Sequence, residues 1–408
     1  MTNVRIFAAC LAAVCLLSSC KKDGGGPGGG SITVTEGGQC AWTIAYAKQG
    51  SDAAAFVNAF ASYTGCSLKS YLETAEQGKN EILIGKTSRQ ETRDALKDIS
   101  NGFKIAFQGD KLIIAGTDDT WTAVALYEFE KRILKSKDYL DGGTLKIPSD
   151  YSFSKSYDDP QTIARLLGSG YTQFTLSAEK LLSCPAEGTI KVAQGAAGDG
   201  TYVYFVLRNG SDSEAKVFKY ELASGKQVAK SEVFNGGHCN DITLNTRTSM
   251  IYVAHGSANP KLLTPLSAKD LSVGLSKTIN TGIGAISYNA TRNCYAVSQG
   301  GTKLSICDHN FVAVTNYSRT DDTGYTAQGM GSDDYYIYFP MSSSADNILV
   351  VYDWNGKYVT TLKINLSMES ESMFYAGGSY YVNFHSSGAQ LYRITPVLSY
   401  TWKGGSSL

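Results

Sequence analysis

A repeated segment in the second half of the chain constrains the fold more than any other feature of the 408 residues. The stretch AQGAAGDGTYVYF at 193–205 is matched by AQGMGSDDYYIYF at 327–339. Related stretches occupy residues 240–253, 284–297 and 371–384. One position of the repeat recurs after 48, 43, 43 and 45 residues, at Tyr204, Tyr252, Tyr295, Tyr338 and Asn383. This regular period indicates one structural unit that is present about five times.

Each period contains several short segments with the alternating pattern of β-strands. In the fourth copy these segments are 336–340, 348–354 and 358–364, and a turn at Asp353-Trp354-Asn355-Gly356 joins the last two. Four short strands in about 44 residues are typical of one blade of a β-propeller. The sequence therefore predicts a β-propeller of about five four-stranded blades over residues 160–408.

The two ends of this repeat region predict how the propeller closes. The fifth copy ends before a fourth strand can form, whereas Glu179–Cys184, upstream of the first copy, has the pattern of a spare outer strand. Pairing these two ends would remove free sheet edges. We therefore expect the upstream strand to complete the fifth blade.

Residues 32–150 alternate between helix and strand patterns, which predicts a small α/β sandwich. A helix is expected through 53–63, and residues 103–107 and 111–115 form a hairpin pattern around Gly109. Asp118 or Asp119 is placed to cap the following helix. The fold class of the whole chain is thus multidomain, with an α/β part followed by an all-β part.

Part of this region resembles a known family. The segments EILIGKTSRQET and GFKIAFQGDKLIIAGTDDTWTAVALYEFEKRIL are similar to the noncatalytic α/β domain that precedes the catalytic barrel of β-hexosaminidases and α-glucuronidases. The similarity covers about residues 78–134. Because that domain is an accessory, the resemblance implies a carbohydrate-related setting and no catalytic residue. Unlike the family, this chain has no (β/α)8 barrel pattern after the domain.

The N-terminus predicts export and a lipid anchor. Residues 1–19 have a charge at Arg5 and then a short apolar run, which is typical of a signal peptide. Leu17-Ser18-Ser19-Cys20 resembles a bacterial lipobox, and the residues after it resemble the start of Bacteroidetes lipoproteins. The resemblance implies cleavage before Cys20 and lipidation of its thiol. Residues 20–31 then form a glycine-rich tether, so we expect the protein in the cell envelope, either periplasmic or at the cell surface.

Composition excludes some classes of partner and cofactor. Lys plus Arg and Asp plus Glu number 37 each, so no strong field favours nucleic acid as a partner. The sequence contains no CxxC pair or Cys/His cluster, and we predict neither a metal site nor a cofactor. The pair Asp333-Asp334 is interpreted as a turn. Whether Cys40 and Cys66 form a disulfide stays open.

Aligning the five copies places one set of polar residues at the start of each innermost strand. Such residues would surround one mouth of the central channel, and they are Gln194, Asn240, Gly284, Gln328 and Glu371. His238 and Glu369 each precede a member of this set by two residues and therefore share its face. The predicted ligand-binding residues are Gln194, His238, Asn240, Asp241, Gln328 and Glu371.

Three functions remain open from the sequence. The leading hypothesis is an exported, membrane-anchored protein that binds a carbohydrate or cell-envelope polymer at this mouth. The alternative is a glycoside hydrolase or polysaccharide lyase, with His238, Glu369 and Glu371 as candidate catalytic residues. A third possibility is a scaffold for protein interactions. The sequence names neither the ligand nor the oligomeric state.

Overall fold

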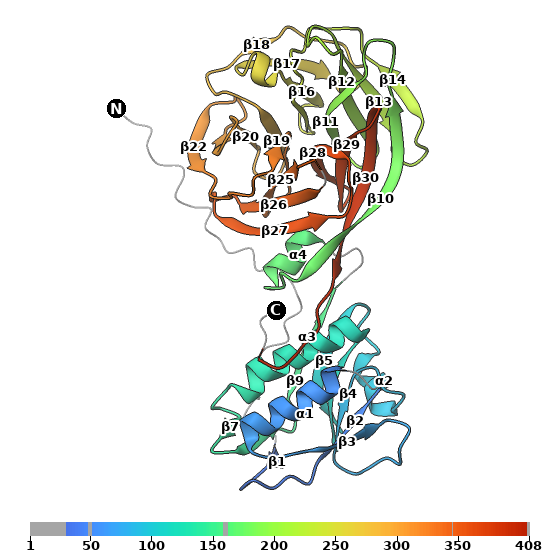
Figure 1. The fold of residues 1–408 in the computed structure, drawn as a ribbon, viewed down its shortest axis with the longest axis vertical. Coiled ribbons are helices and arrows are strands. Elements are labelled where there is room, and N and C mark those ends of the chain that lie inside the picture. Colours follow the sequence, from blue (N-terminus) through green and yellow to red (C-terminus); the bar gives the residue numbers. More distant parts are fainter. Residues whose placement is uncertain (1–29, 48–50, 158–161, 345, 406–408) are drawn as a thin grey trace, which may run out of the picture. The chain divides into compact units, whose positions relative to one another are not determined.

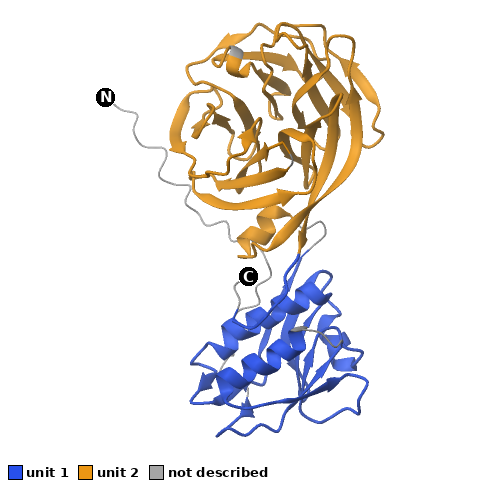
Figure 2. Ribbon diagram, viewed as in Figure 1, with its two compact units in different colours: residues 1–159, 399–408 blue, residues 160–398 orange. Residues whose placement is uncertain are grey.

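A computed structural model describes residues 30–47, 51–157, 162–344 and 346–405. The chain divides into two compact units (Figure 2). The N-terminal unit comprises residues 1–159 and 399–408, and the C-terminal unit comprises residues 160–398. The predicted signal peptide and Cys20 lie outside the described residues. Within the described residues, no helix has the length and apolar character needed to cross a membrane.

The N-terminal unit contains a six-stranded sheet in the order β3-β2-β4-β6-β5-β9 (Figure 1). Four strands pair in parallel: β2 (Thr43–Tyr46), β3 (Lys69–Leu72), β4 (Glu81–Ile84) and β6 (Lys111–Gly116). Two strands pair antiparallel: β5 (Gly102–Gln108) and β9 (Ser152–Ser156). A smaller sheet joins β1 (Ser31–Thr35), β8 (Thr144–Pro148) and β7 (Leu140–Asp141). The helices are α1 (Ser51–Thr64), α2 (Gln90–Leu96), α3 (Asp119–Phe129) and the π-helix η1 (Glu130–Leu134).

Local sequence signals explain several of these elements. Strands β5 and β6 form the predicted hairpin, and Gly109 turns the chain with a φ of 64°, a conformation that favours glycine. The side chain of Asp118 accepts a hydrogen bond from Trp121 N at 2.8 Å, so it caps α3 as expected. Every residue of β4 and β6 is buried, and after the paired first residues Glu81 and Lys111 both strands continue as the apolar runs typical of central parallel strands.

The end of the chain belongs to the N-terminal unit. The sequence predicts that the repeat region extends to residue 408, whereas the contacts of residues 399–405 group them with the N-terminal unit. The side chain of Trp402 is fully buried, and its ring centroid lies 6.1 Å from that of Phe56 in α1. Its Nε1 donates to Glu130 Oε2 at 2.9 Å. Burying this indole and satisfying its N–H explains why the terminal segment packs here.

Cys40 and Cys66 are separate thiols in this structure. Cys66 is buried, and Cys40 is half-buried with its Sγ donating to Val34 O at 3.1 Å. Burial raises the pKa of the Cys40 thiol. The Cys40 thiol is therefore held in the protonated, weakly nucleophilic form at neutral pH.

The C-terminal unit is mostly β and consists of several four-stranded antiparallel sheets in a propeller-like arrangement (Figure 1). Repeat 1 contains β11 (Val192–Gly198), β12 (Tyr202–Arg208), β13 (Ala215–Glu221) and β14 (Gln227–Lys230). Repeat 2 contains β15 (Asp241–Asn245), β16 (Met250–Ala254), β17 (Leu262–Ser267) and β18 (Lys277–Thr278). Repeat 3 contains β19 (Ala285–Asn289), β20 (Cys294–Ser298), β21 (Lys303–Cys307) and β22 (Ala313–Ser318).

The last two repeats share one nine-stranded sheet. In repeat 4 the innermost strand is interrupted, which leaves β23 (Thr326–Ala327), β24 (Gly331–Ser332), β25 (Tyr336–Ser342), β26 (Asn347–Asp353) and β27 (Tyr358–Ile364). Repeat 5 contains β28 (Glu369–Ala376), β29 (Ser379–His385) and β30 (Gly388–Leu398). A short helix, α4 (Ile163–Gly168), precedes the repeats.

An upstream strand completes repeat 5, as the sequence predicted. Strand β10 (Phe174–Pro185) pairs antiparallel with β30 from Phe174↔Leu398 to Pro185↔Gly388. It includes the expected segment Glu179–Cys184. A single parallel bridge, Leu176↔Ile364, also links β10 to β27 and joins the two repeats. Because both ends of the repeat region share one repeat, the outer edge of β30 is covered.

The innermost strands of successive repeats run in the same direction. Asp241 Oδ2 accepts from Ile286 N at 3.0 Å, and two residues further along both strands Thr243 Oγ1 accepts from Tyr288 N at 2.8 Å. Such a constant offset requires parallel neighbours. The starts of these strands therefore meet at one end of a central axis, the strand-start end, and their last residues meet at the other, the strand-end side.

Candidate functional site

The structure brings several predicted site residues together at the strand-start end. Asn240 Nδ2 donates to Gly284 O at 2.8 Å and also to Gln328 O. Gln328 Nε2 donates to Glu369 Oε1 at 2.9 Å, and Glu369 is exposed. Residues from repeats 2, 3, 4 and 5 thus form one continuous hydrogen-bonded chain. Three of the five aligned positions, Asn240, Gly284 and Gln328, are joined in this way, together with Glu369, which precedes the fifth aligned position by two residues.

The predicted set lies in irregular backbone, which sets how its side chains point. Gln194 falls between Ala193 and Ala196, where the pairing of β11 with β12 shifts register. Glu371 falls in the equivalent shift between Ser370 and Ser372. Such bulges kink a strand and re-aim a side chain away from the regular ladder. The same local irregularity therefore recurs at equivalent positions of repeats 1 and 5.

Burial at this end leaves three oxygen atoms without a hydrogen-bond partner among the described residues. They belong to buried side chains and are Gln194 Oε1, Glu371 Oε2 and Asn383 Oδ1. Burial raises the pKa of Glu371 well above its usual range, the negative charge of Glu369 raises it further, and Arg208 opposes the rise. Asn383 was not predicted as a site residue, although it marks the fifth copy of the repeat.

Asp241 has a different environment from the other predicted ligand residues. Its carboxylate is fully buried and accepts three main-chain N–H groups: Ile242 at 2.9 Å, Ile286 at 3.0 Å and Met330 at 3.1 Å. Burial raises the pKa of Asp241, and these hydrogen bonds oppose the rise. Because the donors come from repeats 2, 3 and 4, Asp241 fastens three innermost strands together.

His238 lies at the strand-start side of repeat 2 and pairs with an acidic side chain. Its Nδ1 is 3.0 Å from Asp212 Oδ2, and Arg208 contacts the other oxygen of Asp212 at 2.6 Å. The His238 side chain is about one quarter exposed, at 26%. A histidine held by a carboxylate in this way has a fixed ring orientation and remains open to solvent.

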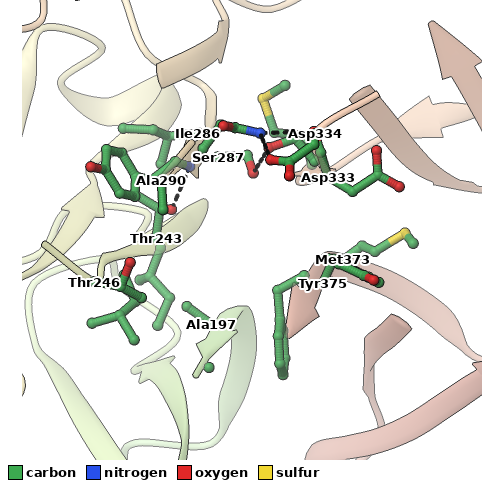
Figure 3. Close-up of a pocket in the computed structure, with 18 residues that line it drawn as sticks. Ala197, Thr243, Thr246, Ile286, Ser287, Ala290, Asp333, Asp334, Met373 and Tyr375 are labelled. Carbon is green, nitrogen blue, oxygen red and sulfur yellow. Dashed lines mark hydrogen bonds between the residues drawn. The ribbon is translucent and has the colours of Figure 1, made fainter. Parts of the chain in front are cut away.

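A cavity of about 150 Å³, drawn in Figure 3, lies on the strand-end side. Residues from all five innermost strands line it, including Ala197 of repeat 1 and Tyr375 of repeat 5. The repeat alignment predicted a site at the starts of these strands and none at their ends. The same alignment could have indicated the cavity, since its lining residues follow each predicted ring position by two to six positions in the aligned segments.

The lining of this cavity combines polar groups with aromatic rings. Ser287 Oγ and Ser332 Oγ are hydrogen-bonded at 2.8 Å. Asn289 Nδ2 donates to Asp333 O at 2.9 Å and to Asp334 Oδ1 at 3.2 Å. Tyr288, Phe374 and Tyr375 supply the aromatic part of the lining. Pockets of this composition can orient a small polar ligand through a few convergent groups.

A buried acid supports the rim of the cavity. Asp333 Oδ2 accepts from Tyr338 at 2.6 Å and Tyr380 at 2.9 Å, while its Oδ1 accepts from Tyr335 N and Tyr336 N. Burial raises the pKa of Asp333, and the Tyr338 hydroxyl opposes the rise. The turn predicted at Asp333-Asp334 thus holds Asp333 inward and leaves the neighbouring Asp334 exposed at the rim.

No protein-family model matches the chain, and no curated protein matches it. Among solved structures, glutaminyl cyclase of Myxococcus xanthus aligns with a TM-score of 0.42 and 12% identity over 56% of this chain and 100% of that chain. A luciferin-regenerating enzyme aligns with a TM-score of 0.36 and 10% identity, over 56% and 99% of the two chains. Hydrazine synthase of Kuenenia stuttgartiensis aligns with a TM-score of 0.33 and 11% identity, over 49% of this chain and 57% of that chain.

Proposed function

We propose that the C-terminal unit is a five-bladed propeller that binds a carbohydrate or cell-envelope polymer in the strand-end cavity. The observation that carries this proposal is the convergence of five innermost strands on one cavity with polar and aromatic walls. Sugars present hydroxyl groups, which both donate and accept hydrogen bonds, and C–H faces, which pack on aromatic rings. The Asp334 carboxylate and the Thr246 hydroxyl, both on exposed residues, can hydrogen-bond sugar hydroxyl groups. The ring of Tyr375 can pack on a C–H face of the sugar.

The size of the cavity limits how much of a ligand can enter. A volume of about 150 Å³ lies below the roughly 300–1,000 Å³ of pockets that enclose drug-sized ligands. We therefore propose that one sugar unit or one chain end enters the cavity, while the rest of a polymer remains outside.

The location of the protein in the cell envelope is part of the same proposal. A lipid on Cys20 would anchor the chain to the cell envelope, where such polymers occur. The resemblance of residues 78–134 to an accessory domain of glycosidases supports the same carbohydrate setting. Cys20→Ser should move the protein from the membrane fraction to the soluble fraction and abolish labelling by a radioactive fatty acid. Retention of both label and membrane association would contradict the anchor.

Binding can be tested with the purified protein and a panel of envelope glycans. We expect Asp334→Asn and Tyr375→Ala each to weaken binding by at least about tenfold, since each removes one class of contact. Tyr358→Ala is a matched control, because Tyr358 is an exposed tyrosine of the same unit outside the cavity. Equal binding by all four proteins would reject the cavity as the binding site.

Glycan cleavage at the strand-start end is the second candidate. It is favoured by two carboxylates in different environments, because burial raises the pKa of Glu371 while Glu369 is exposed. Such a contrast separates the acid and base roles in glycosidases. Turnover of a glycan that Glu371→Gln abolishes and Asp334→Asn leaves intact would favour this candidate over binding in the cavity.

A further inference from the structure

Three unpartnered oxygens at the strand-start end are independent of the strand-end cavity. Gln194 is 4% exposed, Glu371 is 1% exposed and Asn383 is fully buried. Each has one side-chain oxygen with no hydrogen-bond partner among the described residues. Buried polar atoms in native proteins are nearly always satisfied, by protein, water or an ion. Three such atoms in one region therefore require an explanation.

Main-chain geometry places the three side chains at the junction of repeats 1 and 5. Asn383 Nδ2 donates to Gln194 O at 2.6 Å. Asn383 also pairs across β28 and β29 with Ser372, the residue after Glu371. Ser372 Oγ in turn accepts from Ala196 N at 2.6 Å. The segments that carry the three oxygens are thus in direct contact.

Amide flips cannot satisfy the Gln194 and Asn383 oxygens, because both amide nitrogens already donate. The amide nitrogen of Gln194 already donates to Ala193 O at 2.8 Å, and that of Asn383 donates to Gln194 O. Flipping either amide would break a hydrogen bond that the structure makes. Arg208, whose charge acts on Glu371, pairs with Asp212 at 2.6 Å through a terminal guanidinium nitrogen, and its Nε has no hydrogen-bond partner among the described residues.

We propose that Gln194 Oε1, Glu371 Oε2 and Asn383 Oδ1 bind a hard metal cation, calcium, at the junction of the first and last repeats. Carboxylate and amide oxygens are the ligands that calcium prefers, and water supplies the remaining positions. A bound cation would neutralise the buried carboxylate and tie the two ends of the repeat region together. The proposed site has one carboxylate and two amides. The described residues contain no cluster of three or more His, Cys, Asp or Glu side chains that could hold a metal ion.

The test uses the full chain after removal of metal with EDTA and dialysis. Calorimetric titration with calcium chloride should show one site per chain, and calcium should raise the unfolding temperature of the C-terminal unit. Magnesium and zinc should bind more weakly, because magnesium demands octahedral geometry and zinc prefers nitrogen and sulfur ligands. Glu371→Gln should lower calcium affinity by at least about tenfold, the scale of lost metal-site contacts. The control Glu232→Gln, at an exposed carboxylate, should bind like the unchanged protein.

Two results would overturn the proposal. One is the absence of calcium binding in the unchanged, folded protein, and the other is equal affinity in the Glu371→Gln variant. Gln194→Leu provides a second variant should Glu371→Gln fail to fold by circular dichroism. Infrared spectroscopy can detect the band of a protonated carboxyl. If Glu371→Gln removes such a band and calcium does not change it, Glu371 binds a proton in place of the cation. None of these outcomes depends on glycan binding, so the two proposals fail separately.

Discussion

Replacing Glu371 with glutamine should stabilise the metal-free protein at neutral pH. The side chain is 1% exposed, and one of its carboxylate oxygens lacks a donor among the described residues. An unsatisfied buried polar group costs about 1–3 kcal/mol, and more when it is charged. Glutamine keeps the shape and removes the charge. For a unit of this size, each kcal/mol changes the unfolding temperature by roughly 2–4 °C, so we expect an increase of about 2–12 °C.

The effect should depend on pH in a defined direction. Burial raises the folded-state pKa of Glu371 above the ordinary value of 4.5, so the folded state retains the proton to higher pH than the unfolded state. The native carboxyl therefore contributes full stability below about pH 4 and loses it as the pH rises through the folded-state pKa. Glutamine does not titrate. The difference between variant and unchanged protein should be small at pH 4 and largest at neutral pH.

The assay is thermal unfolding of the C-terminal unit between pH 4 and 8 in the presence of EDTA. Glu232→Gln is the control, since Glu232 is an exposed carboxylate of the same unit. Subtracting the curve of the unchanged protein cancels the titration of all other groups. Equal or lower stability of Glu371→Gln at pH 7, or a difference that does not change with pH, would refute the reasoning.

Three further substitutions test separate parts of the structure. Trp402→Ala should destabilise the N-terminal unit by about 3–5 kcal/mol in denaturant unfolding, because it empties a fully buried site, whereas an unchanged midpoint would contradict the docking of the chain end. Asp241→Asn should lower the stability of the C-terminal unit by roughly 1–3 kcal/mol, because an amide nitrogen would face a main-chain N–H that the carboxylate now accepts. Gly195→Ala should destabilise the same unit, because the added Cβ would collide with Ile242 N, and wild-type stability would show that the innermost strands can separate.

Short-range patterns in the sequence determined most of the element order. The repeat period predicted successive four-stranded groups, because each group is built from contiguous residues whose alternation is visible locally. The hairpin around Gly109, the cap at Asp118 and the closing strand from Glu179 to Cys184 followed from the same kind of signal. Aligned positions also indicated which residues gather at the strand-start end, since equivalent positions of a repeat occupy equivalent places.

Only the tertiary structure decided how each of these residues is used. Asp241 and Glu371 occur in the same kind of aligned segment, yet three main-chain donors surround the first and one oxygen of the second lacks a partner. The donors to Asp241 lie up to 89 residues away, and no local pattern specifies them. The strand-end cavity and the docking of Trp402 likewise depend on which distant side chains fill the remaining space. Strand order is encoded over a few residues, whereas burial and hydrogen-bond satisfaction are properties of the packed chain.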